Sequence, residues 1–506
     1  MLKLKFIKNW ALAITALLVF PILLNAQHRG DNIDFQGLSD LNDAGVKATA
    51  MGSAVTSLSG DISSLFYNPA GLASIKEIKV SATANYYSNS WWENQHYRPN
   101  RLFVTLPFYL EGLYIPDPAD DGKLDVDRLW TPDNFIDSNY VINLPDLGKD
   151  PFGKDAADWK RDVKGFAFNN FAAAVPLEIL DQNFVFSAGF SSKINIQNFD
   201  QNNTYLDPHP GYFEYGEIGR VNGNDTLIVN WSRYLRQREG SVYSVVGGIG
   251  YELNKMFSFG LGVNYMWGSS DDYQYLDRVG TFDLLDDNDF RFSYADNYQE
   301  IKGASNYNAL NINFGFQVKL KKFQFGAKVD LPYTLERSFS FTETFKDTAN
   351  NTSTEKSGMD QFKIPAVYNF GVSFYPVENF LLALDYEYAP FSKGSYSIES
   401  SGEPNRKWSD RHTLKFGMEY SPFDFISLLA GYRNIPTTFI PDGTADKKSG
   451  PKADSYTFGL SINTFFGRFD ASYEYRILNY YDSYFSNTNY VTETYTNVMV
   501  GFVYSL

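Results

Sequence analysis

Few residues in this chain could do chemistry, and they are far apart. The four histidines share no metal-binding spacing. No nucleophile elbow or phosphate-binding loop occurs, and the acidic runs at 117–127 and 286–289 do not match a calcium loop. The sequence therefore predicts neither an enzyme nor a metal or cofactor site.

One motif near the N-terminus stands out by its turn chemistry instead. It is the run Asn68, Pro69, Ala70, Gly71 and Leu72. Proline fixes its own φ and biases the residue before it away from helix, so Asn68-Pro69 predicts a kink. The surrounding residues 27–76 mix small side chains with scattered apolar ones and lack strand periodicity. They predict a compact, kinked segment that another element must hold.

The first residues predict export. Three lysines precede an apolar run, 10–24, that is too short to span a membrane comfortably. Asn25-Ala26 is a plausible signal-peptidase cleavage site before residue 27. We predict a signal peptide over residues 1–26. The chain has no cysteine, which excludes a lipid anchor and disulfides. Removing the three lysines takes the net charge from −15 to −18, which argues against nucleic acid as a partner.

Strict alternation identifies the remaining elements as strands. In 257–267 every odd residue is apolar or aromatic, and the even ones from Ser258 to Asn264 are polar or glycine. The stretches 310–320 and 323–331 repeat this pattern on either side of a two-residue turn. Strands of this length exceed those of soluble sandwiches, and they fit a membrane barrel, whose tilted strands need roughly ten residues to cross the apolar band.

Short and long connections alternate along the chain, as they do between the periplasmic and external ends of bacterial barrels. They predict about fourteen strands, an even count that returns both termini to the periplasm. The C-terminal strand resembles the signal read by barrel-assembly machinery, although Leu506 replaces the usual aromatic. The expected strands lie near 77–88, 163–176, 183–199, 240–253, 256–270, 306–320, 323–343, 363–376, 380–398, 408–421, 424–437, 453–466, 468–485 and 490–506.

These elements define the predicted organisation: an all-β, fourteen-stranded antiparallel transmembrane barrel over 77–506, with an N-terminal hatch, or plug, over 27–76 inside its lumen. Long extracellular loops are expected at 89–162, 200–239 and 271–305. Leu102–Tyr114 is placed within the first loop because counting it as a further strand would make the number of strands odd.

Alternation also predicts a polar lumen, so an apolar path for cargo must come from the hatch and loops. Aromatic residues of the first loop are candidates for hydrophobic capture; packing within the loop, or a place in an aromatic girdle, is the alternative. These candidates are Trp91, Trp92, Phe103, Phe108 and Tyr109. The inward charged residues are expected to be Lys328, Asp330, Asp385, Glu387, Lys415, Glu419, Asp470, Glu474 and Arg476.

Three regions resemble one known family. Residues 48–51 with 67–73 are similar to the N-terminal hatch of the FadL/TodX (OMPP1) family of outer-membrane transporters. Residues 363–376 resemble its Pro-then-Gly-then-Tyr strand, and 412–433 its next hairpin. Ser53 departs from the family, which often has a second glycine there, and the first loop is longer than expected.

The resemblance implies passive uptake of long-chain fatty acids or other hydrophobic compounds, such as aromatic hydrocarbons, through a Gram-negative outer membrane. In the family, loops capture the molecule, the hatch rearranges and an opening forms in the wall. Expected partners are this cargo, outer-membrane lipid and lipopolysaccharide, and barrel-assembly machinery during biogenesis. The alternative is a PorV-like component of a type IX protein-secretion or surface-attachment system; a general porin is disfavoured by the plug.

Overall fold

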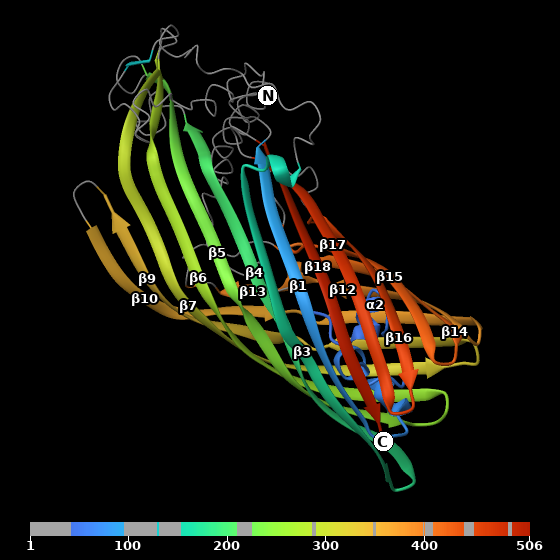
Figure 1. Cartoon of the computed structure of the whole chain (residues 1–506). Helices are drawn as coiled ribbons and strands as arrows, with labels where there is room; N and C mark the ends of the chain where they lie inside the picture. The colour runs from blue at the N-terminus through green and yellow to red at the C-terminus, as the bar shows by residue number, and fades with distance from the viewer. Residues whose placement is uncertain are drawn as a thin grey trace, which may run out of the picture.

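The strands close into one antiparallel barrel (Figure 1). The structure is a computed structural model that describes residues 42–95, 129–130, 153–209, 225–285, 290–347, 351–397, 399, 408–439, 450–483 and 488–506. The strands are β1 (Lys79–Gln95), β2 (Leu129–Trp130), β3 (Trp159–Ile179), β4 (Gln182–His209), β5 (Asp225–Glu252), β6 (Phe257–Leu285), β7 (Phe290–Lys319), β8 (Phe323–Asp330), β9 (Tyr333–Lys346), β10 (Asn351–Ile364), β11 (Val367–Val377), β12 (Phe380–Ala389), β13 (Ser395–Ser397), β14 (Arg411–Phe423), β15 (Ile426–Pro436), β16 (Lys452–Thr464), β17 (Gly467–Ser483) and β18 (Thr488–Ser505).

The barrel has fourteen wall strands, as predicted. Prolines divide two of them: Leu331-Pro332 separates β8 from β9, and Pro365-Ala366 separates β10 from β11. Proline cannot donate to the ladder, so pairing is interrupted there and resumes on either side. The barrel closes where β1 pairs with β18, from Lys79 opposite Ser505 to Gln95 opposite Asn489.

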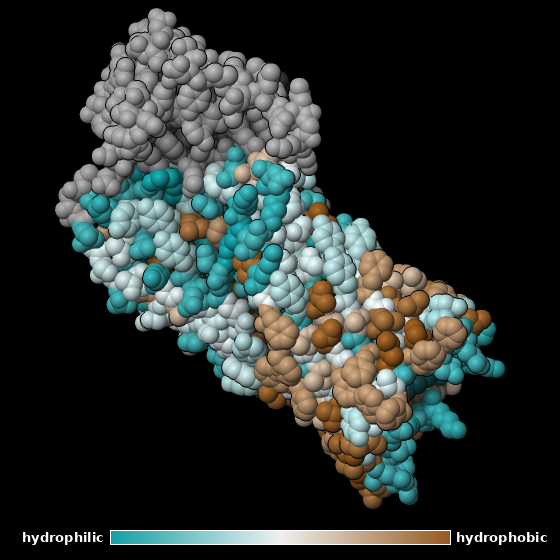
Figure 2. Space-filling view, in the orientation of Figure 1, coloured by the Kyte–Doolittle hydropathy of each residue, from teal (hydrophilic) through white to brown (hydrophobic). Residues whose placement is uncertain are grey.

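The outer surface carries the apolar half of the alternating pattern. Figure 2 shows brown side chains over the half of the barrel that holds the C-terminus, with teal surface beyond them toward the other end. Exposed aromatic residues such as Phe166, Tyr265 and Phe458 belong to this band. A closed barrel with an outward apolar band is the architecture of bacterial outer-membrane proteins, and the protein is assigned to that membrane.

The strands run further from the membrane than predicted. Residues 200–209, 225–239, 271–285 and 290–305, which the sequence assigned to loops, extend β4, β5, β6 and β7. The prediction stopped where outward residues become polar, because a strand that leaves the lipid no longer needs an apolar outer face. The same polar pattern hid the outer parts of β9 and β10.

Residues 42–78, called here the lumen segment, precede the first wall strand. They contain α2 (Val46–Ala50), α3 (Ser64–Tyr67) and the 3₁₀ helix η2 (Pro69–Ser74). Figure 1 shows α2 among the strands, and the side chains of Ala50, Leu65 and Leu72 are almost fully buried. The predicted signal peptide, residues 27–41 of the predicted hatch, and the stretch Leu102–Tyr114 lie outside the described residues. No helix in the described ranges is long and apolar enough to cross a membrane.

Candidate functional site

The inner wall carries glycine at many of the positions where the lumen segment lies against it. A side chain at any of these positions would occupy the space of a segment atom, so their absence lets the two backbones approach. The wall glycines that face segment residues are Gly189, Gly248, Gly250, Gly260, Gly315, Gly326, Gly371, Gly417, Gly431, Gly459 and Gly501. They come from ten wall strands on all sides of the barrel, so the segment spans the lumen.

The first half of the segment binds to β14–β16. The Gly52 amide donates to Thr457 Oγ1 at 3.0 Å, and the Thr457 hydroxyl donates to the Ala50 carbonyl oxygen at 2.9 Å. Gly52 has a φ of +61°, and a Cβ there would lie 2.8 Å from the Phe416 carbonyl oxygen. Only glycine satisfies both the backbone conformation and the close approach.

We expect Gly52→Ala to loosen this attachment. The left-handed conformation alone costs a residue with a Cβ about 1–2 kcal/mol, before any clash with the wall. Trypsin should then cut the folded, detergent-solubilised barrel after Lys47 faster than it cuts wild type, as read by mass spectrometry. Gly247→Ala is the matched control, since a Cβ there meets no atom within 4 Å. Equal cleavage of both variants would contradict the proposed role of Gly52.

The predicted hatch motif forms the second attachment, against β5–β7. The Asn68 side chain accepts the Ala70 amide (3.2 Å) and so caps η2, whose first residue is Pro69. Its amide donates to the Thr56 carbonyl (2.7 Å) and to that of Phe316 in β7 (3.4 Å). Ala70 and Leu72 are completely buried. The motif therefore acts as a structural clasp between two parts of the segment and the wall.

Two cavities lie on opposite sides of the lumen segment. The inner cavity, about 180 Å³, is lined by Asp43, Thr56 and Tyr67 of the segment and by wall residues of β4 to β17. The periplasmic cavity, about 270 Å³, is lined by Lys47, Val55 and Ser63 and by the short turn at 378–379. The two cavities share no lining residue. Adjacent residues such as Val55 and Thr56 face different cavities, so the segment is the partition between them.

A third cavity, about 140 Å³, continues from the inner cavity away from the periplasm. Both are lined by Asn42, Ile435 and Arg476. The described lumen thus contains a succession of spaces that the segment interrupts.

Charge in the inner cavity is mostly positive, although the chain is acidic. Six basic and three acidic side chains line it. Most are paired: Glu387 binds Arg411 (3.0 Å) and Lys415 (2.9 Å), and Lys328 binds Asp330 (2.9 Å). These pairs confirm the predicted inward charges on β8, β12 and β14.

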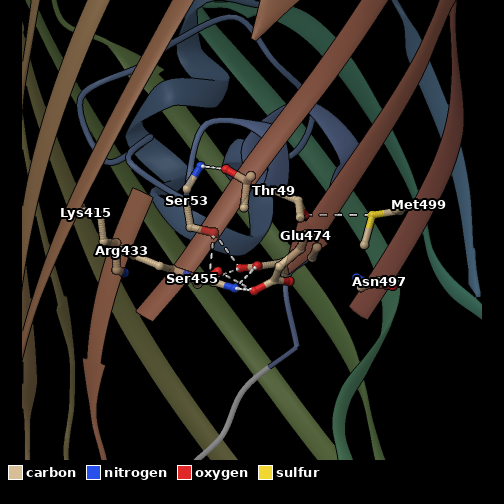
Figure 3. Close-up of polar contacts among 12 residues, drawn as sticks. Thr49, Ser53, Lys415, Arg433, Ser455, Glu474, Asn497 and Met499 are labelled. Atoms are coloured by element: carbon tan, nitrogen blue, oxygen red, sulfur yellow. Dashed lines mark hydrogen bonds and ion pairs between the residues drawn. The ribbon is translucent and has the colours of Figure 1, made fainter. Parts of the chain in front are cut away.

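Arg433 connects the segment to the wall at the centre of this network (Figure 3). Its guanidinium contacts Asp43 of the segment at 2.7 Å and Glu474 of β17 at 2.6 Å, and donates to Ser53 Oγ at 3.1 Å. Ser53 also donates to Asp43. Ser53, where the family often has glycine, is therefore part of the charged attachment.

Two cations of the inner cavity have no carboxylate partner among the described residues. Arg476 lies over the Tyr495 ring at 4.6 Å from its centre. Lys193 lines the cavity, but the sequence did not identify it. Lys193 follows the alternation that places Gly189 and Ser191 inward, and the register shift between Ser192 and Ile194 then places Ile194 inward as well.

The wall also supplies an apolar surface, which corrects the expectation that only the hatch and loops could do so. Buried apolar side chains of β4, β5, β6, β7, β9, β10 and β12 form one cluster with Phe391 and Trp408. Met266, Ile364 and Phe391 of this cluster line the inner cavity. The prediction missed them because it considered inward residues only where charges marked the face. The wall members are Ile194, Ile196, Val242, Met266, Tyr307, Ala309, Leu335, Phe362, Ile364 and Ala389.

Of the predicted capture residues, Trp91 and Trp92 are described. Trp91 is only 6% exposed and packs edge-on against Phe199 at 5.1 Å, beside Trp159 and Val491. Trp92 is the next residue on β1 and is partly exposed. Phe103, Phe108 and Tyr109 lie outside the described residues. Trp91 is thus part of a packed cluster at the inner wall.

The hydrogen-bonded wall is interrupted between β3 and β4. Their pairing runs from Ile179 opposite Gln182 to Asn170 opposite Ser191 and stops there, while β3 continues along β1 to Trp159. Side chains close the break: the Arg161 guanidinium lies 4.9 Å from the Phe199 ring centre and pairs with Glu239 of β5. Among the described residues, 159–169 of β3 have no ladder pairing with β4.

Comparison with solved structures finds similar folds at low sequence identity. A Pseudomonas aeruginosa FadL homologue superposes with a TM-score of 0.58 at 13% identity, over 94% of this chain and 99% of that one. The Pseudomonas putida toluene transporter TodX gives 0.53 at 13% identity, over 92% and 99%. The Ralstonia pickettii toluene transporter TbuX gives 0.51 at 13% identity, over 92% and 100%.

The resemblance to the FadL/TodX group is thereby confirmed for the fold. The family model named BamG matches residues 224–429, from β5 into β15. No curated protein matches the chain. Within the described residues, no group of histidine and acidic side chains could hold a metal ion.

Proposed function

We propose that the protein is an outer-membrane channel for passive uptake of hydrophobic compounds, and that the lumen segment gates it. The observation that carries this proposal is the pair of cavities that share no lining residue and meet at the segment. A molecule in the inner cavity reaches the periplasmic cavity only if the segment moves. The FadL homologue and the toluene transporters with the same fold support the uptake role.

The inner cavity favours a cargo with an apolar chain and an anionic head, such as a fatty acid. Met266, Ile364 and Phe391 offer an apolar surface, and Lys193 and Arg476 offer positive charge that no described carboxylate neutralises. A neutral aromatic hydrocarbon would use the first feature only. Long-chain fatty acids are therefore the cargo we propose.

Lys193→Met tests this cargo class. A charged hydrogen bond is worth about 1.5–3 kcal/mol, so affinity for oleate should fall roughly 10–100-fold. Affinity for the neutral oleyl alcohol should change little. Both are measured by displacement of a fluorescent lipid from the purified barrel. Lys363→Met, which removes an exposed lysine of β10, should match wild type. An equal loss for both ligands would remove the case for an anionic head.

The break between β3 and β4 is our proposed site of wall opening. Only side-chain contacts such as Trp91 with Phe199 close it over residues 159–169 of β3. Separation there costs contacts worth a few kcal/mol, whereas other seams would lose a ladder of hydrogen bonds.

Uptake itself is tested with labelled oleate in a deletion strain complemented with wild type or Asn68→Ala. Deletion should reduce uptake, wild type should restore it, and Asn68→Ala should alter it through the weakened clasp. Unchanged uptake on deletion, together with loss of surface-exported proteins, would favour the PorV-like secretion role instead.

The BamG match favours a second function, in association with the barrel-assembly machinery. That role predicts co-purification with the central assembly barrel and lower levels of many outer-membrane proteins after depletion. The uptake role predicts that depletion changes oleate uptake while those levels stay constant.

A further inference from the structure

Two lysines lie on the outer face of β3, just beyond the apolar band, and a third lies beside them. Lys160 and Lys164 alternate along the strand with Asp162, and the exposed Phe166 and Phe168 follow on the same face. Lys154, the first residue of the 3₁₀ helix η3 (Lys154–Ala156) before β3, pairs with Asp162 and lies 3.1 Å from Ser90 Oγ. The cluster therefore has three basic groups and one acid in a chain whose net charge is −15.

Lys160 and Lys164 are not neutralised by the described residues. No carboxylate of the described residues lies within ion-pair distance of either lysine. Asp162 instead pairs with Lys154 and accepts a hydrogen bond from Ser90. The neighbouring strands present hydroxyls on this face: Lys164 lies opposite Ser88 of β1, and Ser88 lies opposite Thr496 of β18. Hydroxyl and ammonium groups together form a typical donor set for a phosphate.

The height of the lysines matches a lipid headgroup. A strand rises about 3.3 Å per residue, so Lys164 lies roughly 7 Å beyond Phe166, and Lys160 roughly 13 Å further. Aromatic belts mark the membrane interface, and headgroup phosphates lie just outside it. Lipopolysaccharide is the anionic lipid of the outer leaflet, and its lipid A headgroup carries phosphate.

We propose that Lys154, Lys160 and Lys164, with Ser88 and Thr496, bind the phosphates of a lipid A headgroup. The site lies on the part of β3 that has no strand partner toward β4, so a bound headgroup lies beside the break in the wall. Lysines on an unpaired edge also prevent association with foreign strands. Protection of the edge requires only the positive charge of the lysines and no phosphate ligand. The experiment below distinguishes edge protection from phosphate binding.

The test is native mass spectrometry of the purified, detergent-solubilised barrel with diphosphoryl lipid A or its dephosphorylated form. Each lysine near an anionic lipid contributes about fivefold in affinity. Wild type should therefore prefer the diphosphoryl form, and Lys160→Gln/Lys164→Gln should weaken its binding by about thirtyfold. Heat-modifiable migration on gels verifies that each variant is folded.

Lys363→Gln removes a lone outward lysine of β10 and should keep the wild-type preference. Millimolar inorganic phosphate should not displace the lipid, because the headgroup is also held by its acyl chains. Equal binding of both lipid forms by wild type would overturn the proposal. So would wild-type affinity in the double glutamine variant, or displacement by inorganic phosphate.

Discussion

Cross-linking Lys47→Cys to Glu419→Cys is expected to reduce oleate uptake to the level of the deletion strain. The two native side chains meet at 2.8 Å across the periplasmic cavity, one from α2 and the other from β14. A covalent link holds the segment to the wall and keeps the partition between the cavities closed. The chain has no cysteine, so the introduced thiols are the sole targets.

The measurement uses a short thiol cross-linker with a reducible bond, and uptake should return on reduction. Thr342→Cys/Glu355→Cys is the matched control, because its native pair (2.9 Å) joins β9 to β10 far from the segment. That link should leave uptake unchanged. Normal uptake by barrels that are fully linked between positions 47 and 419 would show that cargo passes without movement of the segment.

Arg433→Met is expected to have the opposite effect and open the lumen. It leaves Asp43 and Glu474 buried without their cation, and breaking a buried ion pair costs about 3–5 kcal/mol. The first part of the segment should detach, which joins the inner and periplasmic cavities. Conductance in planar bilayers should rise, and cells should become sensitive to hydrophilic antibiotics that the outer membrane excludes.

The pH dependence of this variant follows from Asp43. Burial alone would raise the pKa of Asp43, but the Arg433 guanidinium and hydrogen bonds from Arg433 and Ser53 hold it below its usual range. In wild type this attachment is present at neutral pH and weakens only as pH falls through that lowered pKa. Without Arg433 burial dominates and the pKa rises, so protonation at mildly acidic pH should relieve the defect and lower the conductance.

A triple variant, Asp43→Asn/Arg433→Met/Glu474→Gln, separates charge from shape. It removes all three charges together, and replacement of a whole buried ion network is often nearly neutral. Conductance should return close to wild type. If the triple variant conducts as much as Arg433→Met, the hydrogen-bond geometry rather than the charge balance keeps the lumen closed. If Arg433→Met itself does not raise conductance, the segment stays bound without the Arg433 contacts.

The sequence predicted the wall well where lipid imposed a two-residue period. Residues 257–267 and 310–320 alternate because one face meets the membrane and the other the lumen, and the strand count of fourteen follows from their spacing. Residues 271–285 are also strand, with one irregularity between Arg278 and Gly280, but no lipid selects their outer face. Hydrophobic periodicity cannot reveal strands beyond the membrane.

The candidate site was predicted less completely, for two physical reasons. The residue types Asn68 and Pro69 predicted a turn, but the hydrogen bonds from Asn68 to the Thr56 and Phe316 carbonyls depend on tertiary packing. A bulge between Ser192 and Ile194 changed which β4 side chains beyond it face inward, and a bulge leaves no reliable trace in the residue types. The apolar cluster was not predicted because its members come from seven separate wall strands.

The glycine-lined interior dictates an order of events in biogenesis. Val46 lies on Gly501 of β18, close to Thr83 of β1, directly behind the seam that closes the barrel. Contacts this close disfavour entry of a folded segment into a finished cylinder. We expect the segment to be in place when the last strand meets the first, so that the wall closes around it.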